Sequence, residues 1–135
     1  IDNLKRLDKD NSRRREIAEF YNREFQSLQD YFSTPSSTGN FTHVYHLYVL
    51  NLLSTSDRDK LINFLKSKNI GTGIHYPTPC HLQPGYKDLV RLAKGGLPVT
   101  ERIAKNIISI PMHPWLKDRE IKKVSSSIKE YFSNK

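Results

Sequence analysis

The segment FTHVYHLYVLNLL, residues 41–53, decides the fold because its composition is that of a buried β-strand. β-Branched and aromatic residues dominate it, and they favour the pleated, packed surface of a sheet. Apolar side chains fall on both alternating faces: Tyr45, Leu47 and Val49 on one, and Val44, Tyr48 and Leu50 together with His46 on the other. This predicts a central strand covered on both sides. His43 and His46 are then expected to be half-buried strand residues with hydrogen-bond partners, and not metal ligands.

Helices are predicted on both sides of this strand. Upstream, apolar residues recur at spacings of three and four from Leu4 to Phe32, which predicts a long amphipathic helix in one or two segments. The small polar residues of STPSSTGN, residues 33–40, mark a surface connection. Downstream, residues 54–71 predict a helix of about three turns that starts at a cap among Ser54 to Ser56 and stops at Gly71.

Three further elements are predicted in the second half of the chain. LPVTERIAKN, residues 97–106, is typical of a short helix with Pro98 in its first turn, and IISIP, residues 107–111, of a short strand. A last helix is expected from about Asp118. This order predicts an α/β (α+β) sandwich, in which a small mixed or antiparallel sheet carries helices mainly on one face. The 135 residues suffice for one compact domain, residues 1–135.

The composition restricts the class of protein. The chain carries a formal charge of +8, one cysteine and no apolar run long enough to span a membrane. We therefore expect a cytoplasmic protein without a membrane partner, and the charge favours anionic ligands. The run Arg13-Arg14-Arg15 is followed by Glu16 and preceded by acidic residues, which is typical of a solvated helix face and not of a nucleic-acid-binding stripe.

The loop NIGTGIHYPTPCHLQPGY, residues 69–86, holds three glycines and three prolines, so it cannot be a regular helix or a central strand. A metal site built from His75, Cys80 and His81 lacks any established ligand spacing. Cys80 as a nucleophile would need an activating base, and its neighbour His81 is expected to point away from it.

Two interpretations of this loop remain open from the residues alone. In the first, His75 and Tyr76 donate hydrogen bonds to phosphate or hydroxyl oxygens of an anionic ligand. Gly71 and Gly73 would then allow sharp turning and close approach, while the prolines order the segment in advance. In the second, the loop is a rigid structural segment whose rings fill space.

Several longer segments resemble one known family. They are YHLYVL at 45–50, LINFLKSKNIGTGIHYPTPCHLQPGYKDL at 61–89 and LPVTERIAKNIISIPMHPWL at 97–116, with the pattern RRxIAxxYN in the first helix. Together they resemble the C-terminal small domain of the DegT/DnrJ/EryC1/StrS family of PLP-dependent sugar aminotransferases. Two departures are small: Lys117 stands where the family commonly has a threonine cap, and Cys80 lies at a variable position.

The resemblance implies the small domain of a fold-type I transferase that works as a homodimer. Its substrates would be a nucleotide-linked keto-sugar and glutamate as amino donor, in amino-sugar or surface-polysaccharide biosynthesis. It implies a substrate-contact role for His75 and Tyr76. Gln83 and Tyr86 are secondary candidates, for which packing of the loop is the alternative role.

The resemblance also implies that catalysis needs a second domain. The Schiff-base lysine and the acidic partner of the PLP ring belong to the family's large domain, upstream of this sequence. None of the lysines here, including Lys87 and Lys94 near the loop, matches that motif. We expect no catalytic residue, no metal and no bound PLP in this chain alone, and no transaminase activity. The alternatives are a sugar dehydratase of the same family and a free-standing basic α/β module that binds nucleotides or RNA.

Overall fold

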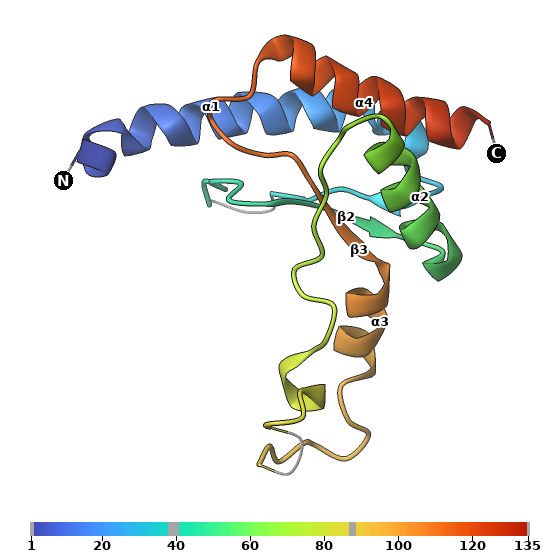
Figure 1. The fold of residues 1–135 in the computed structure, drawn as a ribbon. Coiled ribbons are helices and arrows are strands. Elements are labelled where there is room, and N and C mark those ends of the chain that lie inside the picture. Colours follow the sequence, from blue (N-terminus) through green and yellow to red (C-terminus); the bar gives the residue numbers. More distant parts are fainter. Residues whose placement is uncertain (1, 38–40, 87–88, 135) are drawn as a thin grey trace.

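The computed structural model describes residues 2–37, 41–86 and 89–134 (Figure 1). Its helices are α1 (Asp2–Glu24), α2 (Thr55–Ser67), α3 (Pro98–Asn106) and α4 (Asp118–Ser133), and its strands are β1 (Phe32–Ser33), β2 (Tyr48–Leu52) and β3 (Ile107–Ile110). Two short 3₁₀ turns lie at Gln26–Leu28 and Cys80–Leu82. Within the described residues, no helix combines the length and apolar character needed to cross a bilayer.

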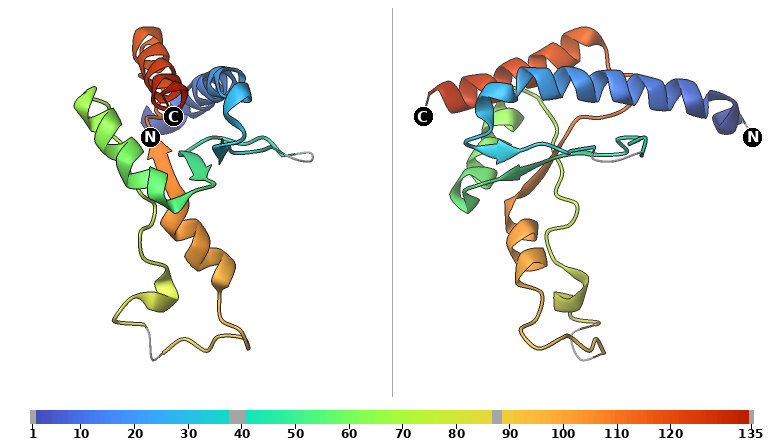
Figure 2. Two further views of the ribbon diagram at one scale, coloured as in Figure 1. Left: turned by 90° about the vertical axis from the view of Figure 1, so that its right-hand side faces the viewer. Right: turned by 180° about the vertical axis from the view of Figure 1, so that it is seen from behind.

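The sheet has three strands in the order β1-β2-β3, and both pairs are antiparallel. The prediction of a small antiparallel sheet with β2 at its centre is therefore confirmed. Figures 1 and 2 show α1 and α4 side by side over one face of the sheet, with α2 next to them. Tyr48, Leu50 and Leu52 of β2 are buried, whereas Val49 and Asn51 are only half-buried. The second face is thus only partly covered, which differs from the expected full cover.

The central strand is much shorter than the predicted residues 41–53. In the register of β2 and β3, Tyr48 pairs with Ile110, so the next residue outward on β3 is Pro111. Proline has no N–H to donate, and Tyr45 takes a left-handed φ of 47°, so the chain leaves the ladder here. The prediction that His43 and His46 are half-buried strand residues is wrong, because both are exposed outside the strand.

The first helix also ends earlier than expected. It stops at Glu24, and the apolar positions beyond it lie in a 3₁₀ turn and in β1. Phe25, Leu28 and Phe32 are nevertheless buried in the core that α1 contacts. The backbone carbonyl of Tyr31 accepts a hydrogen bond from the Leu53 N–H at 2.9 Å, which aligns β1 with β2. The spacing of three and four therefore predicted correctly which residues are buried, but it was wrong in predicting that they all lie in a helix. Residues 38–40 of the predicted connection lie outside the described residues.

Helix α2 ends at Ser67, four residues before the predicted stop at Gly71. Asn69 adopts a left-handed φ of 57°. The Ile70 N–H donates to the Leu65 carbonyl and the Asn69 N–H to the Lys66 carbonyl, both at 2.9 Å. This is a Schellman motif with asparagine in the place that glycine usually takes. The cap directs the chain away from the helices at residue 71.

Arg13 and Arg14 of the arginine run fix the helix to distant segments, which corrects the prediction of a solvated face for these two residues. The Arg13 guanidinium donates to the Leu116 carbonyl at 3.1 Å and to Asp118 at 2.6 Å, and this hydrogen bond holds the pKa of the Asp118 carboxyl below its ordinary value. Nη1 of Arg14 donates to the carbonyl oxygens of Tyr45, His46 and Met112 at 3.5, 3.4 and 3.3 Å. The predicted start of the last helix at Asp118 and the predicted helix at Pro98 are confirmed.

Residues 71–86 and 89–106 form an arm that projects away from the other helices and the sheet (Figure 1). The proline-rich loop descends along it, and α3 returns to the sheet, so the predicted place of the loop at an exposed end is confirmed. The arm carries nine of the fifteen large hydrophobic side chains that are exposed in the described residues. These are Tyr76, Leu82, Tyr86, Leu89, Val90, Leu92, Leu97, Val99 and Ile103. The arm therefore buries little apolar surface of its own.

Candidate functional site

The loop is attached to the sheet at the base of the arm. Gly73 and Ser109 form an antiparallel bridge beside β3. The Gly73 N–H donates to the Ser109 carbonyl at 3.0 Å, and the Ser109 N–H donates to the Gly73 carbonyl at 2.7 Å. The bridge fixes the backbone two residues before His75, the first of the predicted ligand contacts.

His75 is held from two directions. Its Nδ1 lies 2.9 Å from the hydroxyl oxygen of Ser109, within hydrogen-bond distance. Its ring also covers Gly73, because a Cβ added there would lie 2.7 Å from the ring carbon Cε1. The close approach predicted for this glycine is therefore to the imidazole of its own loop, and Gly73 has no left-handed φ that would otherwise require glycine.

Tyr76 lies beside His75 and is open to solvent. Its side chain is 73% exposed, and its ring meets the His75 ring edge to face at 5.7 Å between centroids. Both residues line a hollow of about 620 Å³ between the loop and α3. The rest of its wall is mainly apolar or carries hydroxyl groups, and includes Pro77, Thr100 and Ile103.

The two secondary candidates differ in position. Gln83 lines the same hollow, but its amide Nε2 donates to the Thr78 carbonyl at 3.1 Å and so closes the loop on itself. Tyr86 is 57% exposed and is not part of the wall of this hollow. The structure therefore brings His75, Tyr76 and Gln83 together and leaves Tyr86 apart from them.

His81 has a structural role that the sequence did not indicate. It is buried, and its Nε2 lies 3.1 Å from Oε1 of Glu101 in the first turn of α3. This contact joins the two segments of the arm, the proline-rich loop and α3. Cys80 beside it is exposed. The role of Ser109 was not indicated by the sequence either. The partner of Ser109 is His75 and that of His81 is Glu101, and both partners are distant in sequence, so no local pattern marks these pairs.

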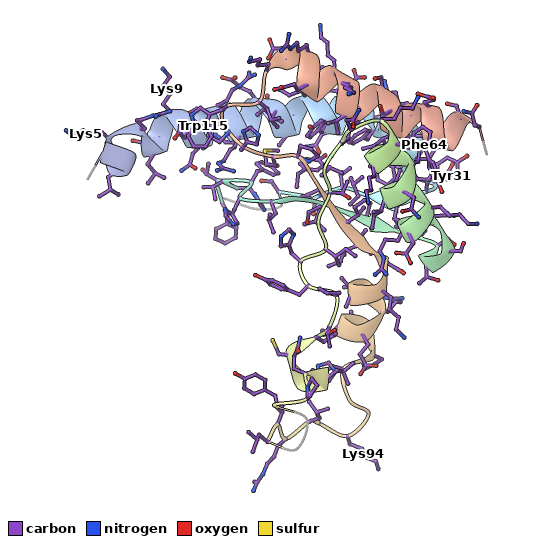
Figure 3. All side chains as sticks on the ribbon, in the orientation of Figure 1. Lys5, Lys9, Tyr31, Phe64, Lys94 and Trp115 are labelled. Carbon is purple, nitrogen blue, oxygen red and sulfur yellow. The ribbon has the colours of Figure 1, made fainter. Side chains whose placement is uncertain are left out.

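The described wall of the hollow does not fit the requirements of PLP. The cofactor needs a lysine amine for its Schiff base and an acidic partner for its ring nitrogen. Neither lysine nor a carboxylate lines the hollow. Lys94 lies at the far end of the arm (Figure 3), and Lys87 is outside the described residues. Among the residues that the structure describes, no group of three histidine, cysteine or acidic residues is placed to hold a metal ion. The residues of this hollow can donate hydrogen bonds to a ligand but cannot anchor PLP.

Comparison with known proteins gives consistent results. The dTDP-3-amino-3,6-dideoxy-alpha-D-galactopyranose transaminase of Aneurinibacillus thermoaerophilus is 32% identical over 128 residues, which are 95% of this chain and 33% of that protein. The crystal structure of a DegT DnrJ EryC1 StrS aminotransferase from Brucella abortus superposes with a TM-score of 0.86 at 30% identity, over 96% of this chain and 33% of that one. S. venezuelae DesV, solved in complex with a ketimine intermediate, has the same TM-score of 0.86 at 30% identity, over 95% of this chain and 33% of that one.

The chain thus spans about a third of the length of these relatives. Its small antiparallel sheet with flanking helices is a fold found in PLP-dependent aminotransferases, as predicted. A sequence model of the DegT/DnrJ/EryC1/StrS aminotransferases matches residues 1–129, nearly the whole chain. The chain belongs to the DegT/DnrJ/EryC1/StrS aminotransferase family.

Proposed function

We propose that the chain is the C-terminal small domain of a longer, cytoplasmic, PLP-dependent aminotransferase. The enzyme transfers an amino group from glutamate to a nucleotide-linked keto-sugar, in the biosynthesis of an amino sugar or a surface polysaccharide. Supporting this, the A. thermoaerophilus relative is a transaminase of a dTDP-linked amino sugar, and the chain matches one third of its length. Neither a free-standing nucleotide- or RNA-binding module nor a dehydratase has such support.

One observation carries the proposed role of this domain, namely the face formed by His75 and Tyr76. Nδ1 of His75 is engaged by Ser109, and no partner of its Nε2 is found among the described residues. The Tyr76 phenol is likewise exposed beside it. Both residues line one hollow, and N–H and O–H donors suit the oxygens of a diphosphate or a sugar. Gln83 helps to shape the loop behind them through its hydrogen bond to the Thr78 carbonyl, and Tyr86 lies outside the hollow, on the outer part of the arm.

The exposed apolar side chains of the arm support a larger assembly. Nine large apolar side chains are exposed on this one segment, and extensive exposed apolar surface on a soluble protein marks contact sites. We propose that the large domain and the second subunit of a homodimer cover this surface. The arm would then bring His75 and Tyr76 to an active site whose other residues lie outside this chain.

PLP would supply the electron sink for amino transfer, bound by a lysine elsewhere in the full-length protein. The isolated chain is then inactive. Incubation of the chain with PLP, borohydride reduction and mass spectrometry would test this, because a single stoichiometric pyridoxyl-lysine adduct would contradict it. In the full-length sequence, a lysine at the Schiff-base position would favour an aminotransferase over a dehydratase.

The substrate role is tested by His75→Ala in the full-length enzyme. We expect the KM for the sugar nucleotide to rise at least severalfold, while the half-reaction with glutamate keeps its rate. His46→Ala is the matched control, because His46 is also exposed but does not line the hollow. An unchanged KM in His75→Ala would remove this residue from the substrate site.

A further inference from the structure

We propose that Ser109 is a positioning residue: its hydroxyl donates to Nδ1 of His75, so that the proton of the neutral imidazole stays on Nε2, the nitrogen offered to the substrate. The inference rests on the proposed function for the identity of the ligand, a phosphate or sugar oxygen of the nucleotide sugar. The geometry of the pair stands without it.

Ser109 is itself held firmly. It is 5% exposed, lies opposite Val49 of β2, and exchanges two backbone hydrogen bonds with Gly73 on its other side. Side chains alternate along a strand, and its neighbours Ile108 and Ile110 are buried in the core on the opposite face. The Ser109 hydroxyl is therefore directed away from the core, at a point fixed by strands on both sides.

The hydroxyl and the imidazole complement each other. A neutral imidazole has one nitrogen that donates and one that accepts, and the partner of one nitrogen decides the role of the other. The Ser109 hydroxyl lies 2.9 Å from Nδ1, and among the described residues it forms its side-chain hydrogen bond with His75. When the hydroxyl donates to Nδ1, the proton must be on Nε2, which becomes a donor.

The absence of a side chain at Gly73 completes this arrangement. A Cβ built on Gly73 would lie 2.7 Å from Cε1 of His75, so the imidazole packs directly against the Gly73 backbone. The backbone therefore supports one side of the ring. Ser109 sets the protonated nitrogen, and Gly73 sets the plane of the ring. The substrate therefore meets a donor whose orientation is fixed before binding, which lowers the entropy lost on binding.

The tautomer can be measured directly in the 135-residue chain with ¹⁵N-labelled histidine. Long-range ¹H–¹⁵N correlation spectra, with His75 assigned from the signals missing in His75→Ala, distinguish protonated from unprotonated ring nitrogens. At a pH where His75 is neutral, we expect its proton on Nε2 in the native chain and a mixture of tautomers in Ser109→Ala. A proton on Nδ1 in the native chain, or identical spectra for Ser109→Ala, would overturn the proposal.

Ser125→Ala is the matched control for this measurement. Ser125 is also buried, at 2% exposure, but its hydroxyl donates to the Lys122 carbonyl within α4. Removing it tests the general effect of losing a buried serine hydroxyl. We expect no change at His75.

Kinetics of the full-length enzyme provide a second test that does not depend on the isolated chain. Ser109→Ala should raise the KM for the sugar nucleotide by about 3- to 10-fold and leave the glutamate half-reaction unchanged. Ser109→Thr, which keeps the hydroxyl, should restore most of the affinity. If His75→Ala raises this KM but Ser109→Ala does not, the positioning role is wrong. If the tautomer is as expected but His75→Ala has no effect on KM, the proposed substrate site is wrong instead.

Discussion

Replacing Gly73 with alanine should move the imidazole of His75 while leaving the fold intact. The new Cβ would lie 2.7 Å from Cε1, and ordinary contact begins near 3.4 Å, so the ring must shift by about 0.7 Å. A shift of this size can take the 2.9 Å contact with the Ser109 hydroxyl to the limit of hydrogen bonding. Gly73 has no left-handed φ, so its backbone accepts alanine without strain.

The expected change in the free energy of unfolding is small because two effects oppose each other. Alanine restricts the unfolded chain more than glycine does, which stabilises the fold by about 0.4–1 kcal/mol. Loss of the hydrogen bond between His75 and Ser109 costs about 0.5–1.5 kcal/mol, and less where water replaces it. The net effect should stay within about 1 kcal/mol of zero.

Gly71→Ala separates the two effects. A Cβ at Gly71 would meet nothing within 4 Å, so this variant gains the same stabilisation without touching the ring. Urea unfolding of both variants gives the free energies, and the KM for the sugar nucleotide in the full-length enzyme gives the effect on binding. We expect a raised KM for Gly73→Ala alone. Finding that the ¹H–¹⁵N signals of the His75 ring and the KM of Gly73→Ala are both those of the native protein would refute the reasoning. A loss of more than about 2 kcal/mol in the free energy of unfolding would refute it as well.

Three other variants or conditions test the fold and the arm. Leu50→Ala removes a side chain with 0% exposure from the central strand and should cost about 2–5 kcal/mol in urea unfolding, and a loss below about 1 kcal/mol would contradict the assigned core. His81→Ala breaks the contact with Glu101. Because the Glu101 side chain is 38% exposed, we expect a loss of only about 1 kcal/mol of local stability, seen as severalfold faster hydrogen exchange in residues 71–106. Unchanged exchange would show that this contact does not stabilise the arm. Burial raises the pKa of Tyr21 and Tyr48 above the ordinary value of 10.0, so the stability they contribute is complete below pH 10 and is lost as the pH rises further. In an alkaline titration, phenolate absorbance from these two rings should appear only as circular dichroism reports unfolding, and earlier titration would show that they are accessible.

Local patterns predicted most elements of the fold but not their limits. The alternation of residues 41–53 found the central strand, yet its start is set by Pro111 on the partner strand, some sixty residues away. The spacing that includes Phe32 correctly predicted a buried position, but Phe32 is buried as part of strand β1 and not of a helix. A pattern of burial cannot distinguish these two when the segment is short.

The same limit applies to the candidate site. The Gly/Pro composition of the loop and its family resemblance were enough to select His75 and Tyr76. The support for His75 comes from Ser109, 34 residues further along the chain. The contact between His81 and Glu101 spans 20 residues. Pairs of this kind depend on how the loop and α3 lie against each other, and one sequence gives no signal for it.

The arm has two limbs that are joined at two heights. Near the tip His81 contacts Glu101, and at the base Gly73 is bridged to Ser109 directly after α3. Two such links prevent the limbs from sliding past each other unless one link breaks. A domain or subunit that binds the exposed apolar side chains would therefore contact a segment whose attachment to the sheet, at Gly73 and Ser109, is also the place where His75 is held.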